Sequence, residues 1–489
     1  MKNVFVIYDD RKKPGYAIRG ITGGNSFGNT IYKRKSLREI VEHHVEAPEL
    51  EKNGIKTKFW LMDSDHIPEL SAFSVKTPVV HIFSDCAVKD PAEFHLLIRK
   101  AVHIRERYIV KDHEKTAVVM FPDLDSWDEM MTDSDTPDAI RLAAEEYPQI
   151  DADAFADISG RDAFLRFITS GFEARFFNFV QGDEYNVVKT STNIRKIHAE
   201  YKFYHLLPDR MKYWFVEPYD YKEENGTASY TMERMHMTDL AIRYVHGAIS
   251  IEEFERILND LFRFISMRTE REVDWDTFYA RRKALYIDKV EQRMAELKED
   301  IEYPMLDSMI RSGTGYDGID AIVKKYEELY DRMIGKHKEK LVEVIGHGDL
   351  CFSNILYSAE TDLMRFIDPK GAEKQDELFT DPLYDIAKLS HSICGSYDFM
   401  NSGLYEITVD EGLFLNLRID GDNHAYIETF KKKIQEAGMD YELIRLFECS
   451  LFLSMLPLHM DRVHKVLAFV LNAIDIIGEL DNSRKGNLF

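Results

Sequence analysis

The feature that most restricts the fold is a pair of motifs, Gly346–Leu356 (GHGDLCFSNIL) and Phe366–Gly371 (FIDPKG). They place Asp349, then Asn354 five residues later, then Asp368 fourteen residues after that, each beside apolar residues of strand character. A carboxylate at the end of a buried strand is costly unless it has a partner. The motifs therefore predict two short strands that hold a polar, ligand-binding loop inside an otherwise helical region.

The residue types at these positions match the needs of phosphoryl transfer. That reaction needs a carboxylate to orient an attacking hydroxyl and accept its proton, and oxygen ligands to hold Mg²⁺ against the phosphates of ATP. Asp349 fits the first role as the catalytic residue. Asn354 and Asp368 fit the second, because hard cations take oxygen ligands. Each residue alone is more often a turn residue, and their combination carries the prediction.

The spacing His347-x-Asp349-x-x-x-x-Asn354, followed by Ile367-Asp368-Pro369, resembles the catalytic and metal-binding loops of the aminoglycoside phosphotransferase and choline kinase family. These proteins are small-molecule relatives of protein kinases, and the resemblance covers residues 160–480. It implies ATP and Mg²⁺ as cofactors and a small-molecule hydroxyl as acceptor. His347 is expected to support the loop by hydrogen bonds.

Asp385, in the segment DPLYDIAKL, is similar to an Asp that follows the metal loop in this family. The resemblance implies that it supports the catalytic loop by accepting backbone hydrogen bonds. A first-turn helical Asp that caps its own helix is the alternative, and both roles are compatible.

The residues that bind ATP are predicted upstream of these motifs. Lys189 ends a strand-like segment, and the resemblance implies that such a Lys holds the α- and β-phosphates. Glu200 lies eleven residues further on, in a helical segment, and is the expected ion-pair partner of Lys189.

A phosphate-covering loop and a hinge complete the predicted nucleotide site. The loop is expected at 169–175, where Ser170 and Gly171 offer backbone N–H groups to phosphate. An ordinary hairpin turn is nearly as good an interpretation. The hinge is expected at 232–235, Glu233 included, where the backbone would bind adenine. Met232 and Met235 are expected to line that slot, although a Met here is more often part of the core.

Changes of pattern divide the chain into three parts. Residues 1–150 alternate apolar runs with charged helical segments, which predicts an α/β domain with a mostly parallel sheet. Residues 160–235 predict a small antiparallel sheet with one helix, and residues 236–480 are mainly helical. The fold class is therefore an α/β domain followed by a bilobal, protein-kinase-like α+β fold with an N-lobe and a helical C-lobe.

The same patterns predict individual elements. Strands are expected in the N-terminal domain at 4–8, 58–62, 79–83 and 117–121, with helices at 35–45 and 91–107. The N-lobe strands are expected at 164–168, 175–180, 185–190, 213–217 and 229–233, with a helix at 194–207. The C-lobe helices are expected at 251–267, 274–297, 319–334, 426–437 and 441–472.

The N-terminal domain carries weaker signals. The segment Arg19–Gly28 is rich in glycine but fits neither the Rossmann nor the P-loop pattern. The strand-like segment VVHIFSD ends at Asp85 and is faintly similar to the metal-binding strand of sugar nucleotidyltransferases. The expected form is a degenerate or structural domain of that shape. Asp123 and Asp125 are a second carboxylate pair, for which a solvated loop is the common meaning.

Composition limits the partners. The 489 residues carry a formal net charge of −23, which disfavours nucleic acid and anionic membranes. No apolar stretch is long enough to span a membrane, so membrane insertion is not expected. Four scattered cysteines, without a CxxC pair, fit a reducing compartment, and a cytoplasmic location is expected.

The sequence thus predicts an ATP-dependent kinase of a small hydroxylated metabolite, such as a sugar, an amino alcohol or choline. A general similarity to bacterial capsule-cluster phosphotransferases implies surface-polysaccharide precursors as one context. A choline-binding aromatic wall has five candidates, although helix-core packing is the commoner use of such rings: Trp275, Phe278, Tyr279, Tyr286 and Tyr397. The alternatives are a bifunctional kinase and nucleotidyltransferase, and a pseudokinase-like scaffold or sensor. The acceptor, the oligomeric state and the choice between ATP and GTP stay open.

Overall fold

The computed structural model describes residues 2–32, 34–63, 75–170, 178–183, 185–334 and 340–485, with backbone alone at 169–170, 178–182 and 483–485. Contacts divide the chain into two compact units. The N-terminal unit comprises Met1–Glu173 with His246–Ala248, and the C-terminal unit comprises Ala174–Val245 with Ile249–Phe489. Each unit has its own hydrophobic cores.

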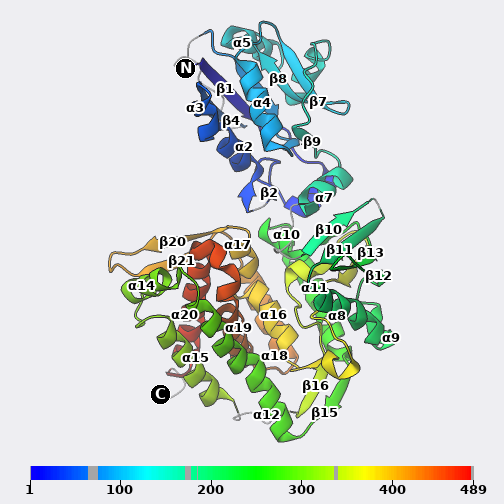
Figure 1. Ribbon diagram of the computed structural model, residues 1–489, viewed down its shortest axis with the longest axis vertical. Helices are drawn as coiled ribbons and strands as arrows, with labels where there is room; N and C mark the ends of the chain where they lie inside the picture. The colour runs from blue at the N-terminus through cyan, green and yellow to red at the C-terminus, as the bar shows by residue number, and fades with distance from the viewer. Residues whose placement is uncertain are drawn as a thin grey trace. The chain divides into compact units, whose positions relative to one another are not determined.

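A five-stranded sheet in the order β4-β1-β5-β8-β7 forms the centre of the N-terminal unit (Figure 1). Its strands are β1 (Lys2–Asp9), β4 (Ile55–Met62), β5 (Val79–Phe83), β7 (Tyr108–Asp112) and β8 (Lys115–Phe121). β1 pairs in parallel with β4 and β5, whereas β8 pairs antiparallel with β5 and β7. Only a tight turn joins β7 to β8, and a parallel pair needs a much longer crossover. The prediction of a mostly parallel sheet is therefore wrong for two of these pairs.

Both faces of this sheet are covered. Alternate residues of β1 belong to different cores, with Val4 and Val6 in one and Phe5 and Ile7 in the other. A strand buried on both faces reads as a continuous apolar run, which explains why β1 stands out in the sequence. The helices of the unit are α1 (Tyr16–Thr22), α2 (Leu37–Val45), α3 (Pro48–Lys52), α4 (Pro91–Ala101), α5 (Leu124–Asp133), α6 (Pro137–Ala143) and α7 (Arg161–Ser170). Short strands are β2 (Ile31–Tyr32), β3 (Lys35–Ser36), β6 (Cys86–Val88) and β9 (Phe155–Asp157).

The strand expected at 164–168 is wrong, because these residues lie in helix α7. Phe164, Leu165 and Ile168 are buried, and their spacing of three and four residues places them on one helical face. A short apolar run of this kind fits a strand or a helix equally well, because five residues do not separate the two periodicities.

A four-stranded antiparallel sheet in the order β10-β11-β13-β12 opens the C-terminal unit. The strands are β10 (Asn178–Gly182), β11 (Asn186–Ser191), β12 (Pro218–Glu224) and β13 (Thr227–Glu233), and α8 (Ile194–Leu206) and α9 (Asp209–Lys212) connect β11 to β12. Ile197 of α8 packs against Ala228 and Tyr230 of β13. A small antiparallel sheet with a packed helix is the form that the sequence predicts for this region.

The strand expected at 213–217 is also wrong, since β12 begins only at Pro218. Trp214 and Phe215 are buried against Phe264 and Phe366, in a core that the helical part of the unit supplies. The apolar cluster at this position therefore reflects packing onto the helical part.

The rest of the C-terminal unit is mainly helical (Figure 1). Its helices are α10 (Leu240–Val245), α11 (Ile251–Met267), α12 (Trp275–Lys283), α13 (Lys289–Lys298), α14 (Tyr303–Gly313), α15 (Ile319–Met333), α16 (Tyr384–Ile393), α17 (Tyr397–Asn401), α18 (His424–Glu436), α19 (Tyr441–Met455) and α20 (Val463–Lys485). A π-helical turn, Ala284–Asp288, joins α12 to α13. The single helix expected at 441–472 is wrong, because a 3-10 segment, Leu456–Arg462, separates α19 from α20. Pro457 lies in that segment and has no backbone N–H to continue a helix.

Three small sheets lie among these helices, and two of them carry the predicted motifs. The strands are β14 (Thr238–Asp239), β15 (Glu270–Glu272), β16 (Val342–Ile345), β17 (Ile355–Ser358), β18 (Leu363–Phe366), β19 (Phe379–Thr380), β20 (Tyr405–Val409) and β21 (Leu415–Ile419). The sheets are β14-β17-β18, β15-β16-β19 and the hairpin β20-β21. The predicted loop therefore runs from β16 to β17, and the second motif follows β18.

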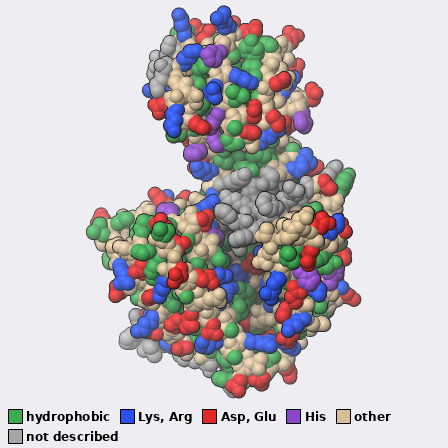
Figure 2. All heavy atoms as spheres, in the orientation of Figure 1, with side chains coloured by type: hydrophobic (Ala, Val, Ile, Leu, Met, Phe, Trp, Pro, Cys, Tyr) green, Lys and Arg blue, Asp and Glu red, His purple; other side chains and the backbone are tan. Residues whose placement is uncertain are grey.

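Acidic and basic side chains are interspersed over the face of the molecule that Figure 2 shows. Among the described helices, none has the length and apolar character that a bilayer span requires.

Candidate active site

The carboxylate of Asp385 holds the loop between β16 and β17 in place. Asp385, fully buried at the start of α16, accepts hydrogen bonds from the backbone N–H groups of His347 (2.9 Å) and Gly348 (2.8 Å). Arg268 lies 3.3 Å from the same carboxylate. Gly346 must be small, because a Cβ there would lie 2.9 Å from an Asp385 oxygen and closer still to Thr380. Asp385 thus fixes the backbone that leads into Asp349.

His347 connects this loop to the second motif. Its Nδ1 accepts a hydrogen bond from the backbone N–H of Asp349, so its Nε2 carries the proton and donates to the carbonyl of Ile367 at 2.9 Å. Burial lowers the pKa of His347, and its ring stacks on Phe215. A neutral, fully used imidazole of this kind orients its neighbours and does not exchange protons with a substrate.

Asp349 lies at the open end of the loop, with 38% of its side chain exposed. Lys388 of α16 approaches Oδ1 of Asp349 at 2.9 Å, and the amide nitrogen of Asn354 donates to Oδ2 at 3.2 Å. The same amide nitrogen donates to the backbone carbonyl of Asp349 at 2.8 Å. Both oxygens of this carboxylate are therefore engaged and its orientation is fixed, while about a third of the side chain still faces solvent.

Lys388 is a site residue that sequence reasoning missed. Burial alone would lower its pKa, but the charge of Asp349 raises the pKa of Lys388 above its ordinary value, so the ammonium stays charged. The available signal was a Lys between Ala387 and Leu389, on a helix that is otherwise apolar at that point. A charged residue on a buried helical face needs a partner, and the nearby motif offers one.

Asp368 follows β18 in a left-handed backbone conformation, with φ at +55°. Lys189 contacts its Oδ1 at 3.0 Å, and 44% of the side chain is exposed. The next residue back, Ile367, donates its backbone N–H to the carbonyl of Asn354 at 3.0 Å. Asn354 and Asp368 are therefore fixed next to each other, although fourteen residues separate them.

Lys189 lies between two carboxylates. Its ammonium is 2.6 Å from Glu200 of α8 and 3.0 Å from Asp368, and both Lys189 and Glu200 are buried. Tyr230 donates its hydroxyl to Glu200 at 3.1 Å. Burial alone would lower the pKa of Lys189, but Asp368 and Glu200 raise it.

The second motif is tied directly to the helix that carries Glu200. Ala372 donates its backbone N–H to the carbonyl of Ala199 at 2.9 Å. Gly371 has a φ of +83°, and a Cβ there would lie 3.0 Å from the α8 backbone. The sheet and the helical part of the C-terminal unit thus meet at Lys189, Glu200 and Asp368.

The other residues predicted for the nucleotide site lie in several different surroundings. Gly171 lies outside the described residues, and Ser170 ends α7 with its side chain undescribed. Glu233 ends β13 with an exposed side chain, and Met235 is half-buried beyond it. A small cavity beside Lys189 is lined by α8, the sheet and the β18 end: Glu200, Phe203, Tyr204, Phe215, Val216, Pro218, Tyr230, Met232, Phe366, Ile367, Asp368 and Pro369. Met232, one residue before Glu233, therefore lines it, whereas Glu233 and Met235 do not.

The five aromatic candidates for a choline site divide into two groups: the rings of Trp275 and Phe278 each contact that of Tyr279, whereas Tyr286 and Tyr397 stack on other partners. Tyr286 is buried and stacks on Phe447 with ring centroids 3.8 Å apart, and Phe278 is buried as well. Trp275 is 60% exposed, whereas Tyr397 is buried and stacks on His391. The helix-core alternative therefore holds for Phe278 and Tyr286.

Behind the catalytic loop lies a pair of buried carboxyl groups. Phe352 donates its backbone N–H to the hydroxyl of Ser392 at 3.0 Å, and a hydrogen bond from Ser392 acts on Asp398. Burial raises the pKa of Asp398 to about 7. Burial, with the charge of Asp398, also raises the pKa of Asp239 to about 7.

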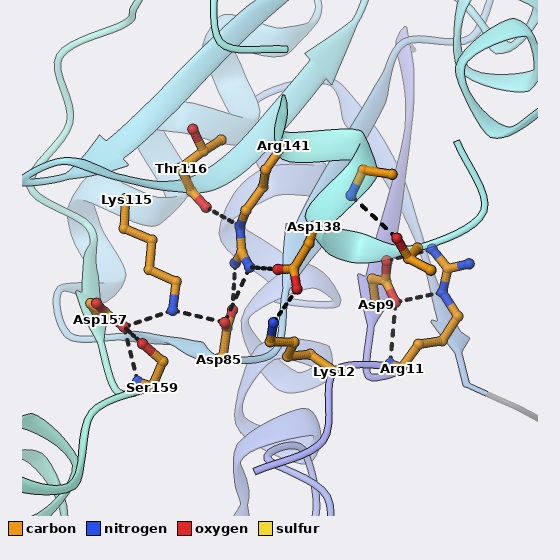
Figure 3. A network of polar contacts seen from close by, with 12 residues as sticks. Asp9, Arg11, Lys12, Asp85, Lys115, Thr116, Asp138, Arg141, Asp157 and Ser159 are labelled. Carbon is orange, nitrogen blue, oxygen red and sulfur yellow. Dashed lines mark hydrogen bonds and ion pairs between the residues drawn. The ribbon is translucent and has the colours of Figure 1, made fainter. Parts of the chain in front are cut away.

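In the N-terminal unit, Asp85 is enclosed by cations (Figure 3). Lys115 lies 2.7 Å from one oxygen of Asp85, and Arg141 contacts both. Asp123 accepts a backbone hydrogen bond from Ser126 and so caps α5. Within the described residues, no group of three or more His, Cys, Asp or Glu side chains is arranged to hold a metal ion. Asp85 thus lies in an ion-pair network, and the structural role of the N-terminal domain stays a prediction.

Neither protein-family models nor curated proteins match the chain. Among solved structures, the chain is similar to a thermostable mutant of aminoglycoside phosphotransferase APH(4)-Ia bound to ADP and hygromycin B, at 11% identity, covering 64% of this chain and 97% of that one, with a TM-score of 0.36. The streptomycin–ATP complex of APH(2")-IIa gives 13% identity, coverage of 64% and 90%, and a TM-score of 0.32. An aminoglycoside-3'-phosphotransferase of type VIII gives 13% identity, coverage of 57% and 88%, and a TM-score of 0.34.

Proposed function

We propose that the protein is an ATP-dependent phosphotransferase that phosphorylates a hydroxyl group of a small metabolite. One observation carries the proposal: four side chains from distant parts of the sequence form a connected set. Lys189 contacts Asp368, the Asp368 segment is bonded to Asn354, and Asn354 is bonded to Asp349. Phosphoryl transfer needs this combination of a phosphate-binding cation, two oxygen ligands and a hydroxyl-orienting carboxylate.

The donor set of Asn354 and Asp368 fits Mg²⁺. The amide nitrogen of Asn354 is used by Asp349, which leaves its amide oxygen as the ligand atom. Lys189 contacts Oδ1 of Asp368, and Oδ2 has no partner among the described residues. Mg²⁺ in kinases takes one or two protein oxygens and completes its shell with water and substrate phosphates. When bound, the ion neutralises charge on the phosphates of ATP.

The residues of this chain then have separate tasks. Lys189 binds donor phosphates, and Glu200 and Tyr230 hold Lys189 in place. Asp349 accepts a hydrogen bond from the acceptor hydroxyl and points its oxygen at the γ-phosphorus. The acceptor oxygen bonds to that phosphorus, the bond to the β–γ bridging oxygen breaks, and ADP leaves with the electron pair. The hydroxyl proton passes to Asp349 and from there to solvent.

Lys388 holds Asp349 in the orientation that this step needs. Its ammonium and the Asn354 amide occupy one oxygen of Asp349 each, so the carboxylate cannot rotate without losing a hydrogen bond. Holding a reactive group within a narrow range of orientations contributes a large part of the rate in such reactions. The charge of Lys388 also favours the phosphoryl oxygens, which carry negative charge throughout.

The test is ADP release from Mg²⁺·ATP, measured by a coupled assay over a panel of sugars, sugar acids, amino alcohols and amino acids, with wild type beside Asp349→Ala. We expect acceptor-dependent ADP release that falls at least about 10²-fold in the variant, since general-base and positioning effects are of that size. ATP binding, followed by the shift in melting temperature, should be retained in the variant. Full activity of a folded Asp349→Ala protein would refute the assignment.

A further inference from the structure

Helix α8 carries Glu200, so the contacts that fix α8 also fix Lys189, the cation that Glu200 holds. One attachment of α8 is to the sheet, because Ile197 packs against Ala228 and Tyr230. The helix has a second attachment, to the segment that follows the second motif. This second attachment uses polar side chains, and it joins α8 to the part of the chain that carries the expected metal ligand.

His198 of α8 makes the polar contact. Its Nδ1 lies 2.8 and 3.0 Å from the two side-chain oxygens of Glu373, which follows Asp368 by five residues. An ionised carboxylate only accepts hydrogen bonds, so Nδ1 of His198 carries a proton and donates it to Glu373. The side chains are 30% and 42% exposed, so the pair lies at the surface of the C-terminal unit.

The ring of His198 also contacts the sheet. Its centroid lies 5.2 Å from that of Tyr221, a residue of β12. The ring of Tyr221 in turn lies 5.2 Å from that of Tyr201, which follows His198 by three residues on α8. Residues three apart on a helix are neighbours on its surface. His198 is therefore the point at which α8, β12 and the segment after the second motif meet.

Glu373 reaches His198 from a backbone that is already fixed. Its own N–H donates to Oε2 of Glu377 at 2.8 Å, within the 3-10 turn that covers 375–378. The residue before it, Ala372, is bonded to the carbonyl of Ala199 on α8. Little of the side-chain placement is therefore left to chance, and the contact with His198 is built into the local backbone.

The segment 368–373 connects three parts of the candidate active site. At its start, Asp368 contacts Lys189 at 3.0 Å. In its middle, the backbone N–H of Lys370 donates to the carbonyl of His347 in the catalytic loop at 3.0 Å. At its end, Glu373 contacts α8. A displacement of α8 would therefore move Lys189 and the expected metal ligand together.

We propose that His198 and Glu373 are positioning residues, which hold α8 in the orientation at which Glu200 presents Lys189 to the donor phosphates. They act through α8 and touch neither ATP nor the acceptor. The inference rests on the nucleotide site of the proposed function and is independent of the acceptor. Because the pair is half-exposed, we expect its loss to change phosphate affinity by only about three- to fivefold.

The experiment compares the binding of ADP and of adenosine to the full-length protein with Mg²⁺, by isothermal titration calorimetry. Lys189 binds phosphates, which adenosine lacks, so a change in the position of Lys189 should weaken ADP alone. We expect His198→Ala and Glu373→Ala each to raise the Kd of ADP about three- to fivefold and to leave that of adenosine unchanged. In the coupled assay, the KM for ATP should rise by the same factor, whereas the KM for the acceptor should not.

Three further variants test whether the contact itself is responsible. His198→Asn keeps an N–H on the atom bonded to Cγ, as Nδ1 is, and should bind ADP nearly as wild type does. The double variant His198→Ala/Glu373→Ala should bind ADP no more weakly than either single variant, because each already removes the contact. The control is Arg195→Ala, which removes an exposed cation from the same helix and should behave as wild type.

The outcomes separate this inference from the proposed function. Equal losses for ADP and adenosine, additive losses in the double variant, or wild-type ADP binding in both single variants would overturn the inference and leave the kinase intact. If His198→Ala does not fold, Glu373→Ala decides alone. ADP binding that responds to both variants, without ADP release for any acceptor, supports the inference and counts against the proposed function. A wild-type protein that does not bind ADP overturns both.

Discussion

Asp85 in the N-terminal unit and Asp368 in the C-terminal unit both lie two residues beyond a strand, yet their surroundings are opposite. Asp85 is 1% exposed in its side chain, and its two oxygens are engaged by Lys115 and Arg141. Asp368 is 44% exposed in its side chain and has one cation on one oxygen. A strand-end carboxylate is therefore available to a ligand only where the rest of the fold leaves it an oxygen.

The acidic and basic side chains of the network around Asp85 balance each other in charge. Arg141 also approaches Asp138, which contacts Lys12, and Lys115 also contacts Asp157 at 2.8 Å (Figure 3). A similar closure occurs at Asp9, which accepts hydrogen bonds from Arg11 and His81; burial alone would raise the pKa of Asp9, but these bonds lower it. Ion pairs within the protein thus neutralise the carboxylates at the ends of β1 and β5, which a bound metal ion would otherwise do.

The strongest test of the contrast is Asp368→Asn. We expect turnover to fall by about 10³-fold, because a bound metal contributes several kcal/mol of charge stabilisation. The concentration of Mg²⁺ for half-maximal activity should rise, whereas the melting temperature should change little, since the side chain is half-exposed. The measurement is kcat against Mg²⁺ concentration. An unchanged Mg²⁺ dependence would show that Asp368 has a structural role only, as Asp85 does.

Asp85→Asn is expected to lower stability and leave turnover unchanged, which is the reverse of Asp368→Asn. Removing one partner of a buried ion pair leaves the other charges uncompensated, which costs about 3 kcal/mol of stability. The loss should appear as earlier denaturant unfolding, with faster hydrogen exchange in β5 and α6, while kcat of the folded protein stays at the wild-type value. Asp138→Asn, with 65% of its side chain exposed, is the control and should cost less than about 1 kcal/mol.

Pyrophosphate release from nucleoside triphosphates tests whether the N-terminal unit is catalytic. Release that Asp85→Asn abolishes, and that Asp349→Ala leaves unchanged, would show that the N-terminal unit has a reaction of its own. The enclosed position of Asp85 leads us to expect none.

Lys388→Met tests whether the charge of Lys388 controls the ionisation of Asp349 as well as its orientation. Removing a cation 2.9 Å from a carboxylate oxygen makes the carboxylate easier to protonate, so the acidic limb of the kcat/KM profile should move to higher pH. At neutral pH we expect a loss of about 10-fold. Lys388→Arg should restore part of the activity and return the limb toward its wild-type position. An equal loss at every pH would indicate a packing role alone.

Local pattern was enough to predict most elements of the C-terminal unit. Helix α11 has the predicted bounds because its apolar residues recur at three and four residues and Ser250 caps its start. The misplaced helix at 441–472 is different, since Pro457 was visible in the sequence and marks the break. The strand expected at 164–168 failed because five residues do not separate the two periodicities.

The site was predictable to the extent that it is local in sequence. Asp349 and Asn354 share one loop, so their spacing carries their geometry. Lys388 and Arg141 were not found, because they reach Asp349 and Asp85 from helices 39 and 56 residues away. Which carboxylate is enclosed and which is open depends on such remote cations, and no short motif encodes them.

The smallest expected effect concerns a carboxyl group of the C-terminal unit that is as buried as Asp85 but has no cationic partner among the described residues. Burial raises the pKa of Asp398 to about 7, whereas an unfolded Asp titrates near 4. Between these values the folded state binds a proton that the unfolded state has lost, so stability falls as pH rises from about 4 to about 7. Asp398→Asn cannot titrate and should therefore be more stable than wild type at pH 8, relative to pH 4.5, by at least about 1 kcal/mol, since one pKa unit corresponds to about 1.4 kcal/mol. Unfolding of both proteins at the two pH values measures it, and parallel pH profiles would mean that Asp398 is already ionised at low pH by a partner within the fold.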